Sequence, residues 1–354
     1  MDDPTRVHTN EDIHVGPGSF RYRVEVGWAM FPGDGCHGEA VGVACDRHDR
    51  VFVFLRGPQP VRVYERDGTF VTSWGEGQFV RPHGIFIGPD DTVYCTDDFD
   101  HTVRAFTPEG RLLLTLGTRG RPSDTGATSV DYRTILRAGA PFHFPTNLAL
   151  GPSGDLYVSD GYGNARVHRF APDGRLLLSW GEPGNRPGQF HVPHGLAVDA
   201  AGTVYVADRE NSRIQLFTAE GIYRGEWTDV ARPCQIFIDA KHQWIYVAEL
   251  GFRAGRWPGT GLPEPGAPGG RVSVFDRNGT LHARWGGGNN PCAPGDFFAP
   301  HGLWVDSRGD LYVAEVSLSG GGRTGLVPAS CHTLQKFVRV VSSLPSRVGP
   351  TGSR

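Results

Sequence analysis

The tripeptide Pro-His-Gly occurs three times in this 354-residue chain, and the three copies carry His83, His194 and His301. Imidazole nitrogens are common zinc ligands, and three of them around one ion leave a fourth position open for a water or a substrate oxygen. The copies lie far apart in the sequence, so only the fold could bring the side chains together. If it does, they predict a zinc site.

Each Pro-His-Gly copy opens one unit of a longer internal repeat. In every unit, two runs of alternating apolar and polar residues flank a turn, which is typical of a β-hairpin. Third and fourth strand-like runs generally follow, and the last ends in Trp-Gly or its equivalent. The six units cover residues 40–55, 82–97, 145–160, 193–208, 233–249 and 300–315. Four antiparallel strands repeated six times predict an all-β fold, a six-bladed β-propeller.

The histidine position alternates from unit to unit. In chain order this position holds Val41, His83, Thr146, His194, Cys234 and His301. Because the first strand of a propeller blade is the innermost, histidines on every second blade are predicted to converge on the central axis. The histidines could instead belong to a repeat consensus and only cap strands. The same position accepts valine, threonine and cysteine, however, so the fold alone does not require histidine.

A second position directly follows the residue that closes each hairpin, which is acidic in every unit but the first, and it is predicted to lie near the histidines. It holds Arg56, Asp98, Gly161, Arg209, Leu250 and Val316 in chain order. Arginine suits bidentate recognition of a carboxylate, although single arginines are often surface ion-pair partners. Tyr162 follows one residue later in the third unit, and a tyrosine beside a cation and a metal can act as a general base. These residues predict a small-molecule or peptide substrate that carries a carboxylate.

Composition limits the remaining possibilities. The formal net charge of −3 gives no electrostatic case for nucleic acid or an anionic membrane as a partner, and no apolar run is long enough for a transmembrane helix. The N-terminus is polar and acidic, unlike a signal peptide, so we expect a cytoplasmic protein. We also expect it to be a monomer. None of the six cysteines forms a C-x-x-C pair, and Cys292 with Cys331 is the one pair that could be bridged.

The repeat also sets the expected domain organisation. Residues 21–340 are predicted to form a single propeller, preceded by an extension over 1–20 and followed by a disordered tail over 341–354. The strand-like run 21–31 is expected to close the ring with the last blade. Insertions that are either functional lids or tolerated additions break the repeat at 118–140, 250–270 and 317–330.

Three stretches, "GQFHVPHGLAVD", "VYVADRENSRIQLF" and "LYVSDGYGNARVHRF", resemble the NHL-repeat propeller of peptidyl-α-hydroxyglycine α-amidating lyase. The resemblance covers about residues 35–340 and is densest over 142–217. That family cleaves the N–C bond of a peptidyl-α-hydroxyglycine, which gives a peptide amide and glyoxylate. The resemblance implies zinc on His83, His194 and His301, an active-site tyrosine at Tyr162 and active-site arginines at Arg56 and Arg209.

The chain departs from that family at the third histidine motif. The family also carries calcium, held in part by two backbone carbonyls that match Val41 and Ile85 and by the aspartate of a Met-Pro-His-Asp motif. This chain has Ala299-Pro300-His301-Gly302 at that point, so one carboxylate and one methionine are missing. Calcium prefers anionic oxygen ligands, which makes it a weaker prediction here than zinc.

The favoured function is therefore a zinc-dependent lyase that cleaves the C–N bond of a carbinolamide. A metal-dependent hydrolase such as a lactonase could use the same axis, but a ring of histidines alone suits zinc better than calcium. A non-enzymatic NHL scaffold that binds a partner on one propeller face is the third possibility.

Overall fold

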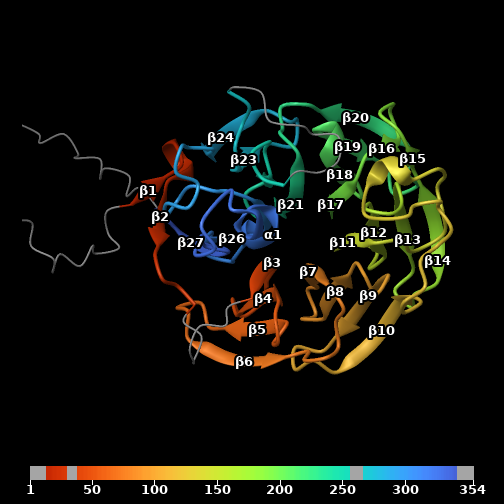
Figure 1. Cartoon of the computed structure of the whole chain (residues 1–354), viewed down its shortest axis with the longest axis horizontal. Helices are drawn as coiled ribbons and strands as arrows, with labels where there is room; N and C mark the ends of the chain where they lie inside the picture. Colours follow the sequence, from red (N-terminus) through yellow and green to blue (C-terminus); the bar gives the residue numbers. More distant parts are fainter. Residues whose placement is uncertain (1–12, 30–37, 256–265, 341–354) are drawn as a thin grey trace, which may run out of the picture.

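The computed structural model describes residues 13–29, 38–255 and 266–340. Viewed along the axis in Figure 1, the sheets are arranged as blades around a centre, and the chain passes from one blade to the next in sequence order. The first strands of successive blades contact one another in a closed ring. The predicted six-bladed β-propeller is confirmed. The predicted tail over 341–354 and residues 1–12 of the predicted extension lie outside the described residues.

Blades 1 to 3 each contain four consecutive antiparallel strands. Blade 1 has β3 (Glu39–Cys45), β4 (Val51–Arg56), β5 (Val61–Tyr64) and β6 (Phe70–Trp74). Blade 2 has β7 (Pro82–Ile87), β8 (Val93–Asp97), β9 (Thr102–Phe106) and β10 (Leu112–Gly117). Blade 3 has β11 (Pro145–Leu150), β12 (Leu156–Asp160), β13 (Arg166–Phe170) and β14 (Leu176–Trp180).

Blades 4 and 5 repeat this order. Blade 4 has β17 (Pro193–Val198), β18 (Val204–Asp208), β19 (Arg213–Phe217) and β20 (Tyr223–Trp227). Blade 5 has β21 (Pro233–Asp239), β22 (Trp244–Glu249), β23 (Arg271–Phe275) and β24 (Leu281–Gly286). A small parallel pair, β15 (Glu182–Pro183) and β16 (Gln189–Phe190), joins blades 3 and 4.

The sixth blade combines both ends of the chain. Its strands are β25 (Pro300–Val305), β26 (Leu311–Glu315), β27 (Leu334–Arg339), β2 (Tyr22–Glu25) and β1 (His14–Val15). β2 pairs with β27 in antiparallel register, with Tyr22 opposite Arg339. The prediction that the 21–31 run closes the ring is confirmed for its strand Tyr22–Glu25, whereas residues 30 and 31 lie outside the described residues. β1 and the buried Phe20 belong to the same blade although they precede residue 21.

Helical segments are short and lie in the connections. They are the helix α1 (Ser317–Gly320) and the 3₁₀ turns η2 (Gly18–Phe20), η3 (Tyr132–Thr134), η4 (Arg209–Asn211) and η5 (Gly322–Thr324). Among the described residues, no helix is long and apolar enough to cross a membrane.

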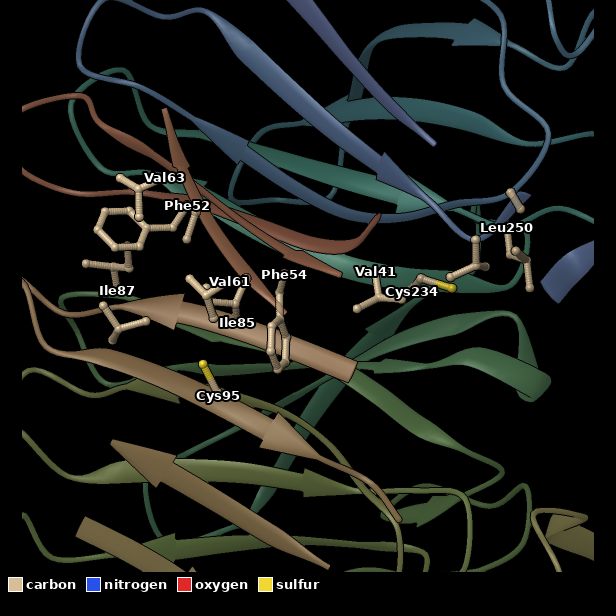
Figure 2. Close-up of a cluster of buried hydrophobic side chains, with 14 of the residues drawn as sticks. Val41, Phe52, Phe54, Val61, Val63, Ile85, Ile87, Cys95, Cys234 and Leu250 are labelled. Carbon is tan, nitrogen blue, oxygen red and sulfur yellow. The ribbon is translucent and has the colours of Figure 1, made fainter. Parts of the chain in front are cut away.

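Apolar side chains fill the spaces between neighbouring blades. In Figure 2, Phe52 and Val63 of blade 1 lie beside Ile87 of blade 2, and Cys95 lies on the next strand of blade 2. The alternation in each strand places one set of side chains against the blade before it and the other against the blade after it. This packing holds the six inner strands at a common axis, where the Pro-His-Gly copies lie.

The closing strand offers a test of how the ring is held together. The hydroxyls of Tyr22 and Tyr246 lie 3.0 Å apart in a buried contact between β2 and blade 5. Tyr22→Phe should lower the free energy of unfolding by about 1 kcal/mol, because one buried hydrogen bond is lost and the Tyr246 hydroxyl keeps only its longer contact with Arg339 Nη1 at 3.4 Å. Urea denaturation measures the difference. Tyr94→Phe is the control on a half-buried tyrosine, and an equal loss there would contradict a specific role for the Tyr22 contact.

Candidate functional site

The three Pro-His-Gly histidines meet at the axis. Their ligand atoms all lie within 4.8 Å of one another, and the ring centroids are 4.7 to 4.9 Å apart. His83 and His194 are fully buried, and His301 is 5% exposed. The predicted convergence of histidines from every second blade is confirmed.

Each histidine ring is oriented by the next blade along. The Nδ1 atom of each ring lies within hydrogen-bond distance of the backbone carbonyl at the equivalent position of the neighbouring unit. The pairs are His83 with Thr146 at 2.6 Å, His194 with Cys234 at 3.0 Å, and His301 with Val41 at 2.6 Å. A carbonyl only accepts, so each Nδ1 must carry the proton and each Nε2 keeps its lone pair.

The histidines are held in their neutral form. Burial lowers the pKa of all three imidazoles, and nearby cations lower it further, so that the pKa of His301 falls to about 3. Neutral imidazole is the form that binds a metal. The three Nε2 atoms are therefore available as a donor set at any ordinary pH.

The glycine of each tripeptide makes this arrangement possible. A Cβ on Gly84 would lie 2.7 Å from the Thr146 carbonyl oxygen, and one on Gly302 would lie 2.8 Å from the Cα of Gly42. The pairing register between the first two strands also shifts directly after the proline in all three copies, which places each histidine in a β-bulge. Pro-His-Gly thus turns the imidazole inward and lets the next blade approach it.

Tyr162 reaches the same point from the loop after β12. Its hydroxyl lies 3.0 Å from His83 Nε2, 3.1 Å from His194 Nε2 and 3.3 Å from Arg209 Nη1. The loop is fixed from behind by the buried Asp160 carboxylate, which accepts the backbone N–H of His143 at 3.0 Å. The loop therefore places the Tyr162 hydroxyl beside the Nε2 atoms that could bind a metal, within reach of Arg209.

The two predicted arginines lie on different sides of the histidines. The Arg56 Nη1 atom lies 2.9 Å from Glu39 and 3.2 Å from the Ser319 hydroxyl. Arg209 is 1% exposed and lies 2.9 Å from Glu210. Burial opposes the charge of Arg209, but Tyr162 and Glu210 raise its pKa, so it stays a cation. Both arginines line one cavity of about 350 Å³ with Tyr162 and His301.

All three predicted insertions border this cavity. Residues Ser129 to Asp131 come from the first insertion, Gly255 from the second, and Ser319 with Gly320 from the third. Residues 256–265 of the second insertion lie outside the described residues. The Ser319 N–H also donates to Glu39, so α1 helps to position the partner of Arg56. Their position at the cavity supports a functional role over simple tolerated additions.

The third insertion is anchored at its far end. Cys331 forms a disulfide with Cys292. This confirms the one cysteine pair that was expected to be able to bridge. The next residue, His332, lies 2.9 Å from the buried Glu315 at the end of β26. Cys45, Cys95 and Cys234 are free and buried. The disulfide and the ion pair together hold the segment that carries α1.

The opposite end of the channel is narrowed one residue beyond the histidine position. There the side chains of Asn147 in blade 3 and Gln235 in blade 5 hydrogen-bond to each other. Further along, the rings of Phe86, Phe237 and Trp304 pack together. The three rings and Gln235 line a separate cavity of about 750 Å³ at that end, whereas Tyr162, His301 and both arginines line the cavity bordered by the insertions.

Comparison with known proteins agrees with this architecture. The NHL repeat family matches residues 142–170 and 190–217, in blades 3 and 4. The human (Homo sapiens) NHL repeat-containing protein 3 is 30% identical over 344 residues, which covers 92% of this chain and 86% of that protein. The chain belongs to the same NHL-repeat protein family.

Two other similarities extend the comparison. Peptidyl-alpha-hydroxyglycine alpha-amidating lyase 1 of Drosophila melanogaster is 33% identical over 170 residues, which covers 44% of this chain and 28% of that protein. The structure of a gluconolactonase from Xanthomonas campestris aligns with a TM-score of 0.56 at 15% identity, over 91% of this chain and 90% of that one. The latter shows the shared fold alone.

The calcium site that the lyase resemblance implies lacks its carboxylate ligand in this NHL-repeat protein, because Gly302 takes the place of the aspartate. The Val41 carbonyl accepts the His301 Nδ1–H, and Gly302 lies directly against the backbone of Gly42, where a larger side chain has no room. Among the described residues, the His83–His194–His301 set is the one His, Cys, Asp and Glu group that could hold a metal, and it contains no carboxylate. Val41 and Ile85 as calcium ligands through their backbone carbonyls stay a prediction, and the Val41 carbonyl also orients a histidine.

Several site residues were missed from the sequence. Nothing in the sequence indicates that the backbone carbonyls of Thr146 and Cys234 orient histidines, because comparing the six units compares only their side chains. Glu39 and Glu210 lie next to strand ends and carry no motif. The sequence indicates Arg81 only weakly. It is the charged residue before one Pro-His-Gly copy, where the other two copies have the apolar residues Val192 and Ala299.

The contact at Gly302 generates one prediction. Gly302→Ala should lower the free energy of unfolding by about 1–3 kcal/mol, because a backbone strand must move to admit the methyl group. The same movement should separate the Val41 carbonyl from His301 and weaken metal binding. Thermal unfolding and zinc titration measure the two effects. Full stability together with unchanged zinc affinity would contradict this packing.

The His332–Glu315 pair generates a second prediction. Burial alone would lower the His332 pKa, but the hydrogen bond and charge of Glu315 outweigh it and raise that pKa. The pair therefore stabilises the fold fully below the ordinary histidine pKa, and this contribution is lost as the pH rises through the raised value. His332→Gln should reduce the unfolding free energy most near pH 6 and least at alkaline pH. A loss independent of pH, measured by denaturant titration, would contradict the ion pair.

Proposed function

We propose that this protein is a zinc-dependent lyase that cleaves the C–N bond of a carbinolamide, a peptidyl-α-hydroxyglycine or a related small α-hydroxy compound. The observation that carries the proposal is the meeting of three neutral imidazoles, a tyrosine hydroxyl and two arginines at one cavity. The relationship to amidating lyases supports the reaction type.

The donor set fits zinc. Three buried imidazoles with their Nδ1 protons committed to carbonyls present three nitrogen lone pairs and no carboxylate, which is the donor chemistry of a catalytic zinc site. His83, His194 and His301 would hold the ion. When bound there, zinc would supply Lewis acidity toward a substrate oxygen.

Tyr162 is placed to move the proton of the substrate hydroxyl. Its oxygen already contacts two of the three Nε2 atoms, so a hydroxyl held at the ring lies within its reach. As the phenolate, Tyr162 takes that proton, the oxygen electrons form the C=O bond, and the C–N bond breaks. The departing amide nitrogen then accepts the proton from Tyr162, which restores the phenolate, and no water is consumed.

The arginines are suited to the carboxylate and to the charge that develops. Arg209 lies 3.3 Å from the Tyr162 oxygen and its guanidinium lies 5.3 Å from the ring centroid, so it stabilises negative charge on that oxygen. Arg56 is held at the cavity wall by Glu39 and the Pro82 carbonyl. Two fixed cations bind a carboxylate without reorganising.

The central test separates the metal from the proton transfer. His194→Ala should lose bound zinc and lyase activity together, whereas Tyr162→Phe should keep the zinc and lose at least about 100-fold in kcat. Metal analysis and chromatography of the amide and glyoxylate formed from N-benzoyl-α-hydroxyglycine measure the two properties. His242→Ala, at a partly exposed histidine outside the cavity, is the matched control. Wild-type protein that stays free of zinc when zinc is supplied would overturn the proposal.

The lactonase-like alternative makes a different product prediction, because a hydrolase incorporates water into a new acid or alcohol.

The cytoplasmic location also stays a prediction. The Cys292–Cys331 disulfide favours an oxidising compartment instead, since such bonds persist there. Thiol counting on protein taken directly from its native cells distinguishes the two locations.

A further inference from the structure

A third arginine, Arg81, lines the same cavity and has no role in the reaction proposed above. It directly precedes Pro82 and His83 at the start of blade 2. The backbone carbonyl of Pro82 accepts the Arg56 Nε–H at 3.1 Å, so Arg81 lies on the same side of the cavity as Arg56. Arg209 comes from blade 4, on the other side of the axis.

The Arg81 guanidinium is held loosely. Its Nη1 atom lies 3.4 Å from the Asp98 carboxylate, and its Cζ lies 4.4 Å from the ring centroid of Phe99. Within the described part of the chain, it donates no hydrogen bond. The side chain is 23% exposed. Its N–H groups are thus directed neither to backbone carbonyls nor to a close carboxylate.

Asp98 is a weak counter-ion. Its side chain is fully buried, and neither of its oxygens has a hydrogen-bond partner among the described residues. Burial raises the pKa of this carboxyl to about 7, although Arg81 opposes the shift. Arg56 and Arg209, by contrast, each lie 2.9 Å from a glutamate oxygen. Arg81 is therefore the least neutralised of the three arginines at the cavity.

We propose that Arg81 binds a second anionic group of the substrate, on the acyl side of the scissile bond. This inference rests on the proposed function, which assigns the first carboxylate to Arg56 and Arg209. A cavity of about 350 Å³ suits a small molecule rather than a long peptide. The substrate class is then an N-acyl-α-hydroxyglycine whose short acyl group ends in a carboxylate.

The test uses unreactive analogues that lack the α-hydroxyl group. N-succinylglycine has the second carboxylate, and N-(4-methylpentanoyl)glycine replaces it with an isopropyl group of the same shape. Calorimetry on the zinc-loaded protein should show at least about tenfold tighter binding of N-succinylglycine, which corresponds to one charge-assisted contact. Arg81→Gln should abolish this preference and leave the affinity for the isopropyl analogue within about twofold.

Two further variants keep the result interpretable. Arg81→Lys retains the charge and should keep part of the preference, and Arg175→Gln, at an exposed outer turn, should keep all of it. Equal affinity of the wild-type protein for the two analogues, or a preference that survives in Arg81→Gln, would overturn the inference. Because binding is measured without turnover, an Arg81-dependent preference without cleavage of α-hydroxy compounds would refute the lyase and leave the anion site standing.

Discussion

The site depends on one repeated hydrogen bond, from the Nδ1 of each histidine to a backbone carbonyl of the next blade. Three such bonds bring all six blades into the site, because three blades supply imidazoles and the three between them supply carbonyls. The bond fixes the tautomer and the ring orientation at once.

The surrounding charges follow from the same geometry. Hairpin ends return to the mouth where the inner strands begin, so residues just after the second strand face the histidines. This position supplies Arg56 and Arg209, and their neighbours Glu39 and Glu210 keep the guanidinium groups in place. The insertions border the cavity at this mouth. On the other side of the histidines, the hydrogen bond between Asn147 and Gln235 crosses the axis. The proposed chemistry lies at the mouth of the propeller where Arg56, Tyr162, Arg209 and His301 line one cavity.

Much of this could be predicted from the sequence because the repeat is explicit. Aligned units showed the number of blades, the closing strand and the convergence of His83, His194 and His301. Comparison of the repeat units could not show contacts made by the backbone, so the bonds from the carbonyls of Thr146, Cys234 and Val41 to the histidines were missed. Arg81 was missed because its importance comes from its loosely held guanidinium and the buried Asp98, which are properties of packing rather than of residue type.

The central claim is that the three Nε2 atoms hold one zinc ion. X-ray absorption at the zinc edge, on protein loaded with one equivalent of zinc, tests it most directly, because imidazole and thiolate ligands give distinct scattering. The account predicts one tightly bound zinc per chain with three imidazole ligands and no sulfur. Failure to bind zinc, or coordination that includes the sulfur of Cys234, would contradict it.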